Sequence, residues 1–482
     1  MNKATRLVQR NMPPTIVLLF GLLSVLPLLH TRSICSDDGL FHIHKAVGLE
    51  AVIELGHWFP RWSPHMAHGF GYPLYNFYAP LGSYVLAGLH ALGFIYPVAL
   101  HVIFGLCILL SGMAVFALVR NWWGPWAGMA AAVVYETSPY LAFNVLFRGA
   151  LSETIALFWL PMTLWAIDRA LRQESPRWGT IGALCFGALI YTHNTSALLA
   201  APLIVAYAIF LASKLRRPKS PIYAFATIIG GLALSAHFWL PAMIERDLVH
   251  TENLLVPPVF TYYTNFLNGD ELLATPTPAQ PLLLNPSPPK ALGTVAATLA
   301  LVGAASVMLP HARSKTNKLM LGATQQLFFS VSLFIYGSLT LSPTMPLWEA
   351  IPLLHFVQFP WRMLGVATLC AAILAGAATT WSAILSRPWL GAAIVAIVAA
   401  LGHLSWWYPR YCGEFTESTV GTMLEYEYQT FTVGTSAKGE FLPKTVHFLP
   451  NDNTVAEALM AGESPARLRG LPANITPNIL DY

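Results

Sequence analysis

The chain has 482 residues, of which 55% are hydrophobic and only 10% are charged, and its formal net charge is +4. A soluble domain carries about 25% charged residues, whereas this chain gathers its apolar residues in runs of about twenty, the length of a membrane-spanning helix. The composition therefore excludes an ordinary soluble protein and predicts an all-α, multi-pass membrane protein, with the lipid bilayer as its partner. The few Lys and Arg residues form short clusters between the apolar runs, where they indicate topology, and we expect no nucleic-acid partner.

The first apolar run, at about 15–34, follows Lys3, Arg6 and Arg10 and has no small-residue cleavage site after it. Basic residues before a spanning run favour the cytoplasmic side of the membrane, and the missing cleavage site argues against a removed signal peptide. We therefore expect an uncleaved anchor, with the N-terminus in the cytoplasm and the next loop, 35–73, outside.

The first outer loop opens with two adjacent carboxylates, Asp37 and Asp38, at the surface end of the first helix. Charged groups at membrane depth are costly and often mark a functional site, although this pair could also simply end the helix. Arg61 lies later in the loop, in an aromatic setting that would also suit an interface anchor. Five histidines fall in this loop, namely His42, His44, His57, His65 and His68. They leave a divalent metal ion open, but we favour structural or interfacial histidines.

Residues 74–96 are apolar enough to cross the membrane, yet a crossing here conflicts with the placement of the later basic clusters. Pro73, Pro80 and Pro97 interrupt helical hydrogen bonding around this segment, and the preceding "GFGYP" at 69–73 favours a sharp turn. We therefore expect a tilted or re-entrant helix packed against the others. A full crossing, with another span failing, is the competing interpretation.

The later apolar runs are each long enough to cross a bilayer. They lie at about 98–119, 124–143, 151–169, 178–194, 197–213, 221–240, 291–310, 319–341, 362–385 and 389–408. Placing the basic clusters 213–220 and 311–318 in the cytoplasm gives about eleven crossings, with the C-terminus outside. The expected domains are a transmembrane domain, 1–409, and a small external tail, 410–482.

The long outer loop, 241–290, contains the Pro-rich stretch 275–289, which is typical of an exposed, extended linker. Cys35 and Cys412 each follow a spanning run that is expected to emerge on the outer side. A disulfide between them requires an oxidising compartment. Two unrelated thiols are an equally good interpretation.

Charged residues at other helix ends collect on the same outer side. Arg148 and Glu153 lie in the second outer loop, His193 follows the fifth span, and Arg362 opens the tenth. Arginines there could bind the phosphate of a lipid carrier whose chain lies between helices, while an Asp accepts the proton of an acceptor hydroxyl that attacks the sugar. Simpler interpretations stay open: Arg148 could pair only with Glu153, Arg362 could be an interface anchor, and His193 could be a packing residue.

Several of these stretches also carry a family resemblance. They are "GHWFPRWSPHMAHGFGYPLYNFYAPL" (56–81), "SPYLAFNVLFRGALSE" (138–153), "VQFPWRML" (357–364) and "VGTSAKGEFLP" (433–443), together with Asp38, Gly39, His42 and Lys45. In combination they resemble bacterial membrane proteins named for a 6-pyruvoyl-tetrahydropterin-synthase-related domain. A pterin synthase with a zinc site is a further interpretation of that name, but the first outer loop is too short to form a soluble synthase fold.

Proteins of that family resemble glycosyltransferases of the C-fold (GT-C), in which an acidic residue of the first outer loop is catalytic and the donor is a polyprenyl-phosphate sugar. The resemblance implies that role for Asp38 or its neighbour Asp37, and it relates Glu153 loosely to the second-loop acid of the fold. The chain departs from the pattern in having no DxD or similar motif in its second outer loop.

The sequence therefore predicts a GT-C-like membrane glycosyltransferase that moves a sugar from a polyprenyl-phosphate donor to an acceptor on the outer face. The expected catalytic residues are Asp37, Asp38 and Glu153, and the expected substrate-binding residues are His42, Arg61, Arg148, His193 and Arg362. The alternatives are a carrier or flippase for a lipid-linked substrate, which needs charges along a path through the bundle, and a non-catalytic membrane partner that retains the fold.

Overall fold

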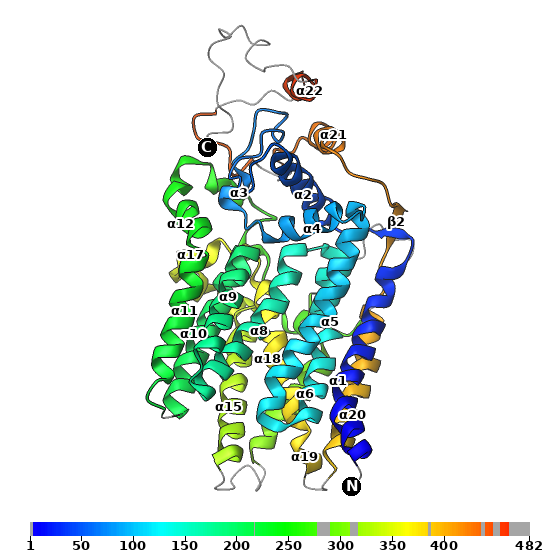
Figure 1. The fold of residues 1–482 in the computed structure, drawn as a ribbon, viewed down its shortest axis with the longest axis vertical. Coiled ribbons are helices and arrows are strands. Elements are labelled where there is room, and N and C mark those ends of the chain that lie inside the picture. Colours follow the sequence, from blue (N-terminus) through cyan, green and yellow to red (C-terminus); the bar gives the residue numbers. More distant parts are fainter. Residues whose placement is uncertain are drawn as a thin grey trace.

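In the computed structural model the chain forms an elongated bundle of helices with a folded cap at one end (Figure 1). The structure describes residues 3–215, 217–276, 290–308, 317–383, 387–434, 439–446 and 454–461. The N-terminus lies at the end of the bundle opposite the cap, and we call these the N-terminal end and the cap end. Within the described ranges, five helices are long and apolar enough to cross a membrane, or six if one bent pair counts as a single span.

The long helices run roughly along the bundle axis. They are α1 (Lys3–Val25), α5 (Tyr96–Trp123), α6 (Pro125–Glu136), α8 (Leu151–Gln173), α9 (Pro176–Thr192), α10 (Asn194–Leu215), α11 (Ser220–Leu234), α14 (Thr294–Ala305), α15 (Asn317–Ser338), α18 (Leu364–Ala378) and α20 (Pro388–His403). Helix α18 is the core helix, because every one of its side chains is buried. Its small residues allow this: a Cβ at Gly376 would lie 2.7 Å from the Ala127 carbonyl oxygen of α6, the close approach typical of membrane helices.

The expected spans correspond to helices, but the expected number of crossings is not confirmed. In the run at 124–143, the regular helix α6 ends at Glu136. The chain continues as the short helix α7 (Pro139–Ala142) and then as a π-helical turn, Phe143–Arg148. The run at 221–240 breaks after Leu234, where α11 meets α12 (Ala236–Glu245) at a bend of 65°. Most of the Pro-rich stretch 275–289, the basic residues 311–316 and the chain after 461 lie outside the described residues.

The segment 74–96 forms no spanning helix. It contains the short helices α3 (Leu74–Phe77) and α4 (Leu81–Ala91). The 11 residues of α4 extend only about 16 Å at 1.5 Å per residue, about half the thickness of a bilayer core, and α4 packs against α2 and α5 at the cap end. This agrees with a tilted segment. Before it, Gly71 has φ +88° and a Cβ there would clash with the Trp62 ring at 2.2 Å, so the turn requires glycine.

The cap joins the first loop to the C-terminal tail. It contains α2 (Gly39–Glu54), α21 (Val420–Thr430), α22 (Thr454–Met460) and an antiparallel pair of short strands, β1 (Arg32–Ile34) and β2 (Tyr411–Glu414). A disulfide links Cys35 to Cys412 beside this strand pair. The buried Glu427 of α21 accepts the backbone N–H groups of Ala67 and His68 at 3.2 and 3.0 Å. The described part of the tail is therefore docked on the first loop.

Four shorter helices complete the described fold. They are α13 (Gly269–Leu272), α16 (Met345–Ala350), α17 (Pro352–His355) and α19 (Thr380–Ala383). A 3-10 turn, Pro360–Met363, leads directly into α18 and carries Arg362 at the cap end of the core helix.

Candidate active site

Asp38 lies at the start of α2, where the first loop meets the π-helical turn that ends at Arg148. The backbone N–H of Asp37 donates to the Phe147 carbonyl at 2.9 Å, and that of Asp38 donates to the Arg148 carbonyl at 2.6 Å. An Asp at a helix N-cap usually accepts a hydrogen bond from its own helix, but the Asp38 side chain makes no such bond. Its Oδ2 atom instead faces Arg148 Nη2 at 3.4 Å, with 40% of the side chain exposed.

This contact depends on two glycines that let the backbones approach closely. Gly149 has φ +62°, and a Cβ there would lie 2.4 Å from Ser36 Oγ and 2.9 Å from the Gly39 nitrogen. A Cβ at Gly39 would also meet Ser36 Oγ at 2.4 Å. Larger residues at either position would push the first loop away from the π-helical turn, and with it Asp38 from Arg148.

Glu153 is the buried partner of two arginines. Arg148 Nη1 donates to Glu153 Oε2 at 2.6 Å, and Arg362 Nε lies 3.9 Å from the same oxygen. The other carboxylate oxygen accepts from the Tyr140 hydroxyl, and only 4% of the Glu153 side chain is exposed. Because both oxygens are already engaged, this geometry suits Glu153 as a positioning group for the arginines better than as a direct participant in catalysis.

Arg362 is held from one side and leaves a donor unused. Its Nη1 donates to the Val357 carbonyl at 2.9 Å, and its guanidinium lies 4.8 Å from the centre of the Phe359 ring. Its buried Nε has no hydrogen-bond partner among the described residues. Two guanidinium groups thus share one buried carboxylate, with the partly exposed Asp38 as the second acid beside Arg148, and the planar donors of Arg362 are suited to an anionic ligand.

Lys290 adds a further cation that the sequence interpretation missed. Its Nζ lies 5.6 Å from the centre of the Trp361 ring and 5.9 Å from that of Phe143. The pKa of Asp37 is raised above its usual value by burial and by the neighbouring Asp38, while Arg148 and Lys290 act in the opposite direction. The only sequence signal was a single Lys between the Pro-rich stretch and the next apolar run.

On α2, His42 and Lys45 form the buried side of the site. The Lys45 ammonium lies between two aromatic rings, 3.2 Å from the centre of Phe41 and 3.1 Å from that of Tyr78. Burial lowers the pKa of Lys45, and Asp38 partly offsets this effect. Burial also lowers the pKa of His42 well below its usual value, so His42 is a neutral hydrogen-bonding group at neutral pH. Sequence reasoning had noted Lys45 only as part of the family resemblance.

Not every expected residue joins this cluster. Arg61 pairs with Glu245 at 3.6 Å and remains 48% exposed, and Asn76 donates to the same carboxylate at 2.7 Å. This separate surface pair does not include Arg148 or Arg362. His193 is bonded through Nδ1 to Ser196 Oγ at 2.7 Å, although it lies close enough to Glu153 for the two groups to interact electrostatically.

The described residues contain no group of three His, Cys, Asp or Glu side chains arranged to hold a metal ion. The histidines of the first loop are instead dispersed. His44 packs edge-on against Tyr426 of α21, with ring centres 5.1 Å apart, and His68 joins the cap through its backbone bond to Glu427. These contacts give His44 and His68 structural roles in the cap.

Comparison with known proteins finds one family whose model matches part of the chain. Residues 78–239 match the model of a family described as dolichyl-phosphate-mannose-protein mannosyltransferase, a segment that contains Arg148 and Glu153 but neither Asp38 nor Arg362. An uncharacterized protein of Lactococcus lactis subsp. cremoris (strain MG1363) is 21% identical over 239 residues, which are 47% of this chain and 39% of that relative.

Two solved structures show a weak overall likeness. ArnT from Cupriavidus metallidurans bound to undecaprenyl phosphate is 13% identical, with a TM-score of 0.47 over 80% of this chain and 64% of that one. The Archaeoglobus fulgidus oligosaccharyltransferase in its apo form is 12% identical, with a TM-score of 0.48 over 91% of this chain and 60% of that one. The resemblance to proteins with a 6-pyruvoyl-tetrahydropterin-synthase-related domain stays a prediction. The chain is thus a mostly helical protein with several apolar helices long enough to span a membrane, and its residues 78–239 are similar to the dolichyl-phosphate-mannose-protein mannosyltransferase family.

Proposed function

We propose that this protein transfers a sugar from a polyprenyl-phosphate donor to an acceptor at the cap end, with Asp38 as the general base. The observation that carries the proposal is the contact between a half-exposed carboxylate and a buried arginine pair: Asp38 lies 3.4 Å from Arg148, and Arg148 and Arg362 share the single buried carboxylate of Glu153. The family match over 78–239 agrees with this chemistry.

The arginine pair is suited to a phosphate that stays attached to its lipid. Arg148 and Arg362 offer charge-assisted hydrogen bonds at the cap end of the apolar bundle, and Lys290 adds positive charge at longer range. The isoprenoid chain of the donor would lie among the apolar helices. Glu153 holds the two guanidinium groups in place before the donor arrives, which reduces the ordering that binding requires.

Transfer at this site is a single displacement at the anomeric carbon of the donor sugar. The acceptor hydroxyl oxygen attacks the anomeric carbon, the bond from that carbon to the phosphate oxygen breaks, and the hydroxyl proton passes to Asp38. The polyprenyl phosphate leaves with the bonding electrons, stabilised by Arg148 and Arg362. Both residues are tied to the turn through their backbone N–H groups, but Asp38 is better placed than Asp37 because its side chain also contacts Arg148.

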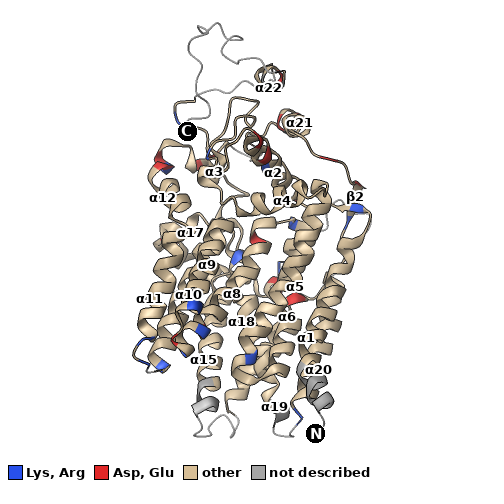
Figure 2. Cartoon of the chain, in the orientation of Figure 1, with Lys and Arg blue, Asp and Glu red and all other residues tan. Residues whose placement is uncertain are grey.

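Two features support an external cap end. The disulfide between Cys35 and Cys412 lies there, and disulfides persist in oxidising compartments. Figure 2 shows carboxylates around α2, α12 and α21 at the cap end, whereas Lys214 in the last turn of α10, and Arg217 and Lys219 just after it, lie at the other end. This distribution agrees with the tendency of basic residues to stay in the cytoplasm.

The test is a transfer assay in membranes with radiolabelled polyprenyl-phosphate sugars. Asp38→Asn should abolish transfer, Asp37→Asn should retain most of it, and Asp247→Asn, at an exposed ion pair of the same end, should match the wild type. Full transfer by Asp38→Asn would remove Asp38 from the mechanism. Absence of transfer with every donor by well-folded wild-type protein would favour the carrier or the non-catalytic partner.

A further inference from the structure

A cluster of two carboxylates, one histidine and one tyrosine joins the C-terminal tail to the helix that follows Asp38. His90 of α4 lies between the carboxylates: its Nδ1 is 2.6 Å from Glu50 Oε2 of α2, and its Nε2 is 3.7 Å from Glu417 Oε2 of the tail. Tyr96, the first residue of α5, donates its hydroxyl to Glu50, and its ring stacks on the imidazole with centres 4.1 Å apart. Four segments of the chain therefore meet at one imidazole.

Only the protonated imidazole of His90 satisfies both carboxylates. A neutral imidazole has one N–H donor and one acceptor nitrogen, so one of the two carboxylates would face a lone pair. The imidazolium presents an N–H group to each side and places a positive charge between the two acids. In the described part of the chain, the ion pairs of Glu50 and Glu417 are both made with His90, so its charge is the one that joins them.

The other groups packed around α4 are uncharged in the range where histidine titrates. Tyr96 is a phenol, and phenols ionise only near pH 10. Helices α8 and α9 pack against the opposite end of α4, through the hydroxyls of Ser152 and Tyr191. The His90 side chain is 30% exposed, so water reaches it. Histidine is the side chain that ordinarily changes charge between about pH 5 and pH 8, and it is the titrating group of this cluster in that range.

The tail has few other contacts where Glu417 lies. Residues 415–419 connect β2, which carries the disulfide, to α21, which is docked on the first loop. Apart from its ion pair, Glu417 accepts the backbone N–H of its neighbour Ser418 at 2.8 Å and that of Tyr96 at 3.5 Å. We infer that His90 is a pH-sensitive latch: its protonated form docks the tail segment 415–419 on α2 and α4, and loss of that proton releases the segment.

Release of the tail would reach the first loop by two routes. Helix α2, which carries Glu50, begins directly after Asp38, and the disulfide joins the tail to Cys35. An effect of the latch on transfer therefore rests on the proposed function. Docking of the tail is measured without substrate, so that a failure of the latch and a failure of the proposed function are separate results.

The test is the mobility of a nitroxide label on Thr416→Cys in the full chain, recorded by electron paramagnetic resonance at about pH 5.5 and about pH 8. The free cysteines are buried, so the label reacts at the new site. In wild-type background the ratio of immobilised to mobile label should fall about threefold between these values, the size expected for a partly exposed ion pair. His90→Gln should show the low ratio at both pH values, and His90→Lys should show the high ratio at both. An unchanged ratio in the wild type, or the wild-type fall in His90→Gln, would overturn the latch.

Two other histidines contact the same tail and provide matched controls. His30 stacks on Tyr411 of β2 with ring centres 3.9 Å apart, and His101 of α5 meets the Phe415 ring edge-on at 5.2 Å. His30→Gln and His101→Gln should each keep the wild-type fall in the ratio. Loss of the fall in either variant would assign the pH dependence to that histidine and contradict His90.

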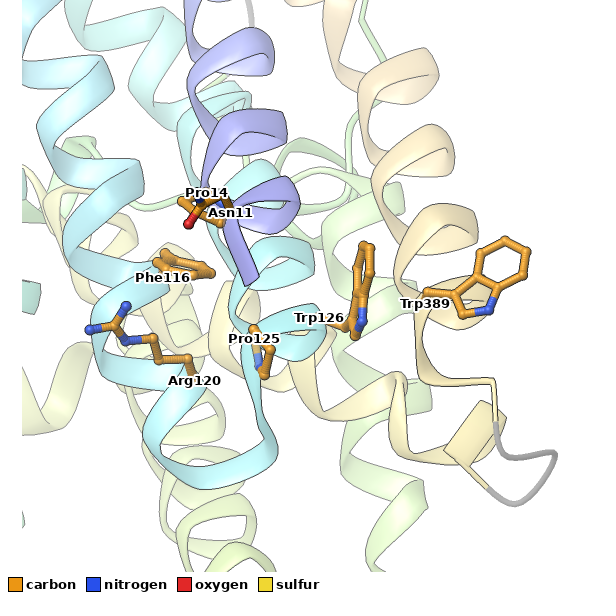
Figure 3. A pocket seen from close by; sticks show the side chains of 7 residues that line it. All are labelled: Asn11, Pro14, Phe116, Arg120, Pro125, Trp126 and Trp389. Atoms are coloured by element: carbon orange, nitrogen blue, oxygen red, sulfur yellow. The ribbon is translucent and has the colours of Figure 1, made fainter. Parts of the chain in front are cut away.

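A second label separates the latch from a pH effect on the whole bundle. At the N-terminal end, a pocket of about 650 Å³ is lined by Phe116, Trp126 and Trp389 among others, and its described lining contains no His, Asp or Glu (Figure 3). A label on Trp389→Cys, a position that is 49% exposed, should therefore have the same mobility at both pH values. An equal pH effect at both labels would show a change of the whole bundle and contradict a local latch.

Discussion

Two buried acid–arginine clusters on the same helix, α8, differ in how completely their charges are satisfied. At the N-terminal end, Asp168 is fully buried and accepts from Trp122 Nε1 at 3.0 Å, from the Tyr207 hydroxyl at 2.8 Å, and from Arg172 Nε at 2.8 Å. At the cap end, Glu153 balances both Arg148 and Arg362, and the half-exposed Asp38 reaches Arg148 from the surface.

The contrast agrees with a structural role for the Asp168 cluster and with the proposed functional role of the cap-end cluster. The Asp168 carboxylate has one arginine and two neutral donors, so its acceptor capacity is used within the protein. The cap-end cluster has more guanidinium donors than buried acceptors, and its remaining carboxylate faces solvent. A buried charge pair alone is weak evidence of function, and each cluster holds one buried arginine nitrogen without a hydrogen-bond partner among the described residues, Arg172 Nη2 and Arg362 Nε. The accessible Asp38 carboxylate is therefore the feature that supports the proposed site at the cap end.

Replacing Glu153 should have the largest effect on stability. Glu153→Gln leaves two buried guanidinium groups without their shared counter-charge, and breaking a buried pair in this way costs about 3–5 kcal/mol. Asp168→Asn should cost less, because Arg172 is 20% exposed and can turn toward water or headgroups. Thermal unfolding of both variants in detergent checks the order. A larger loss in Asp168→Asn would reverse the comparison.

The disulfide should matter only at the cap end. Cys412→Ser releases the tail from the segment that precedes Asp38, and loss of a native disulfide typically costs about 2–4 kcal/mol. We expect a lower unfolding temperature and weaker transfer activity, with the same change in wild type treated with a reductant. Cys412→Ser has no disulfide and should not respond to the reductant, whereas Cys370→Ser, which alters a buried free thiol of α18 and keeps the disulfide, is the matched control and should respond as the wild type does. Equal transfer by Cys412→Ser and wild type would show that the disulfide does not position Asp38.

Replacing Arg362, whose Nε has no hydrogen-bond partner among the described residues, should affect transfer more than folding. Arg362→Lys keeps the charge but removes the planar guanidinium, so it should lose one charge-assisted bond to the donor phosphate, worth about 1.5–3 kcal/mol, which corresponds to a decrease of about 10- to 150-fold in kcat/KM. Arg172→Lys, the matched change beside Asp168, should leave kcat/KM unchanged per folded molecule. Equal decreases in both variants would contradict a ligand role for Arg362.

The sequence predicted the apolar helices and the candidate residues better than it predicted the contacts between those residues. The length of the apolar runs and the charge clusters located the apolar helices and placed Asp38, Arg148, Glu153 and Arg362 near helix ends on one side. Residue spacing could not show that Glu153 joins two arginines that are 214 positions apart, because that contact depends on how α8 packs beside α18.

The same physical reason explains why the sequence analysis missed Lys290 and misplaced Arg61. Lys290 reaches the cluster only because the chain returns to the cap end before α14, which composition does not encode. Arg61 was grouped with the phosphate ligands by its position in the first loop, but the turn at Gly69 and Gly71 directs that loop so that Arg61 meets Glu245 instead. Tertiary packing, and not local propensity, therefore selects which outer charges form the site.

The smallest expected effect concerns Asp37 and its dependence on pH. Its pKa is raised in the folded protein, chiefly by burial and then by Asp38, so the folded state binds this proton more tightly than the unfolded state. The associated stability is present below the unfolded value of 3.8 and is lost as the pH rises through the raised folded value. Asp37→Asn should therefore be slightly more stable than wild type at pH 7, by less than about 1 kcal/mol because the group is partly solvated. The advantage should vanish near pH 3.5. Unfolding temperatures across this range measure the difference, and a variant that is less stable than wild type at pH 7 would show that the Asp37 carboxylate makes a favourable interaction in its ionised form.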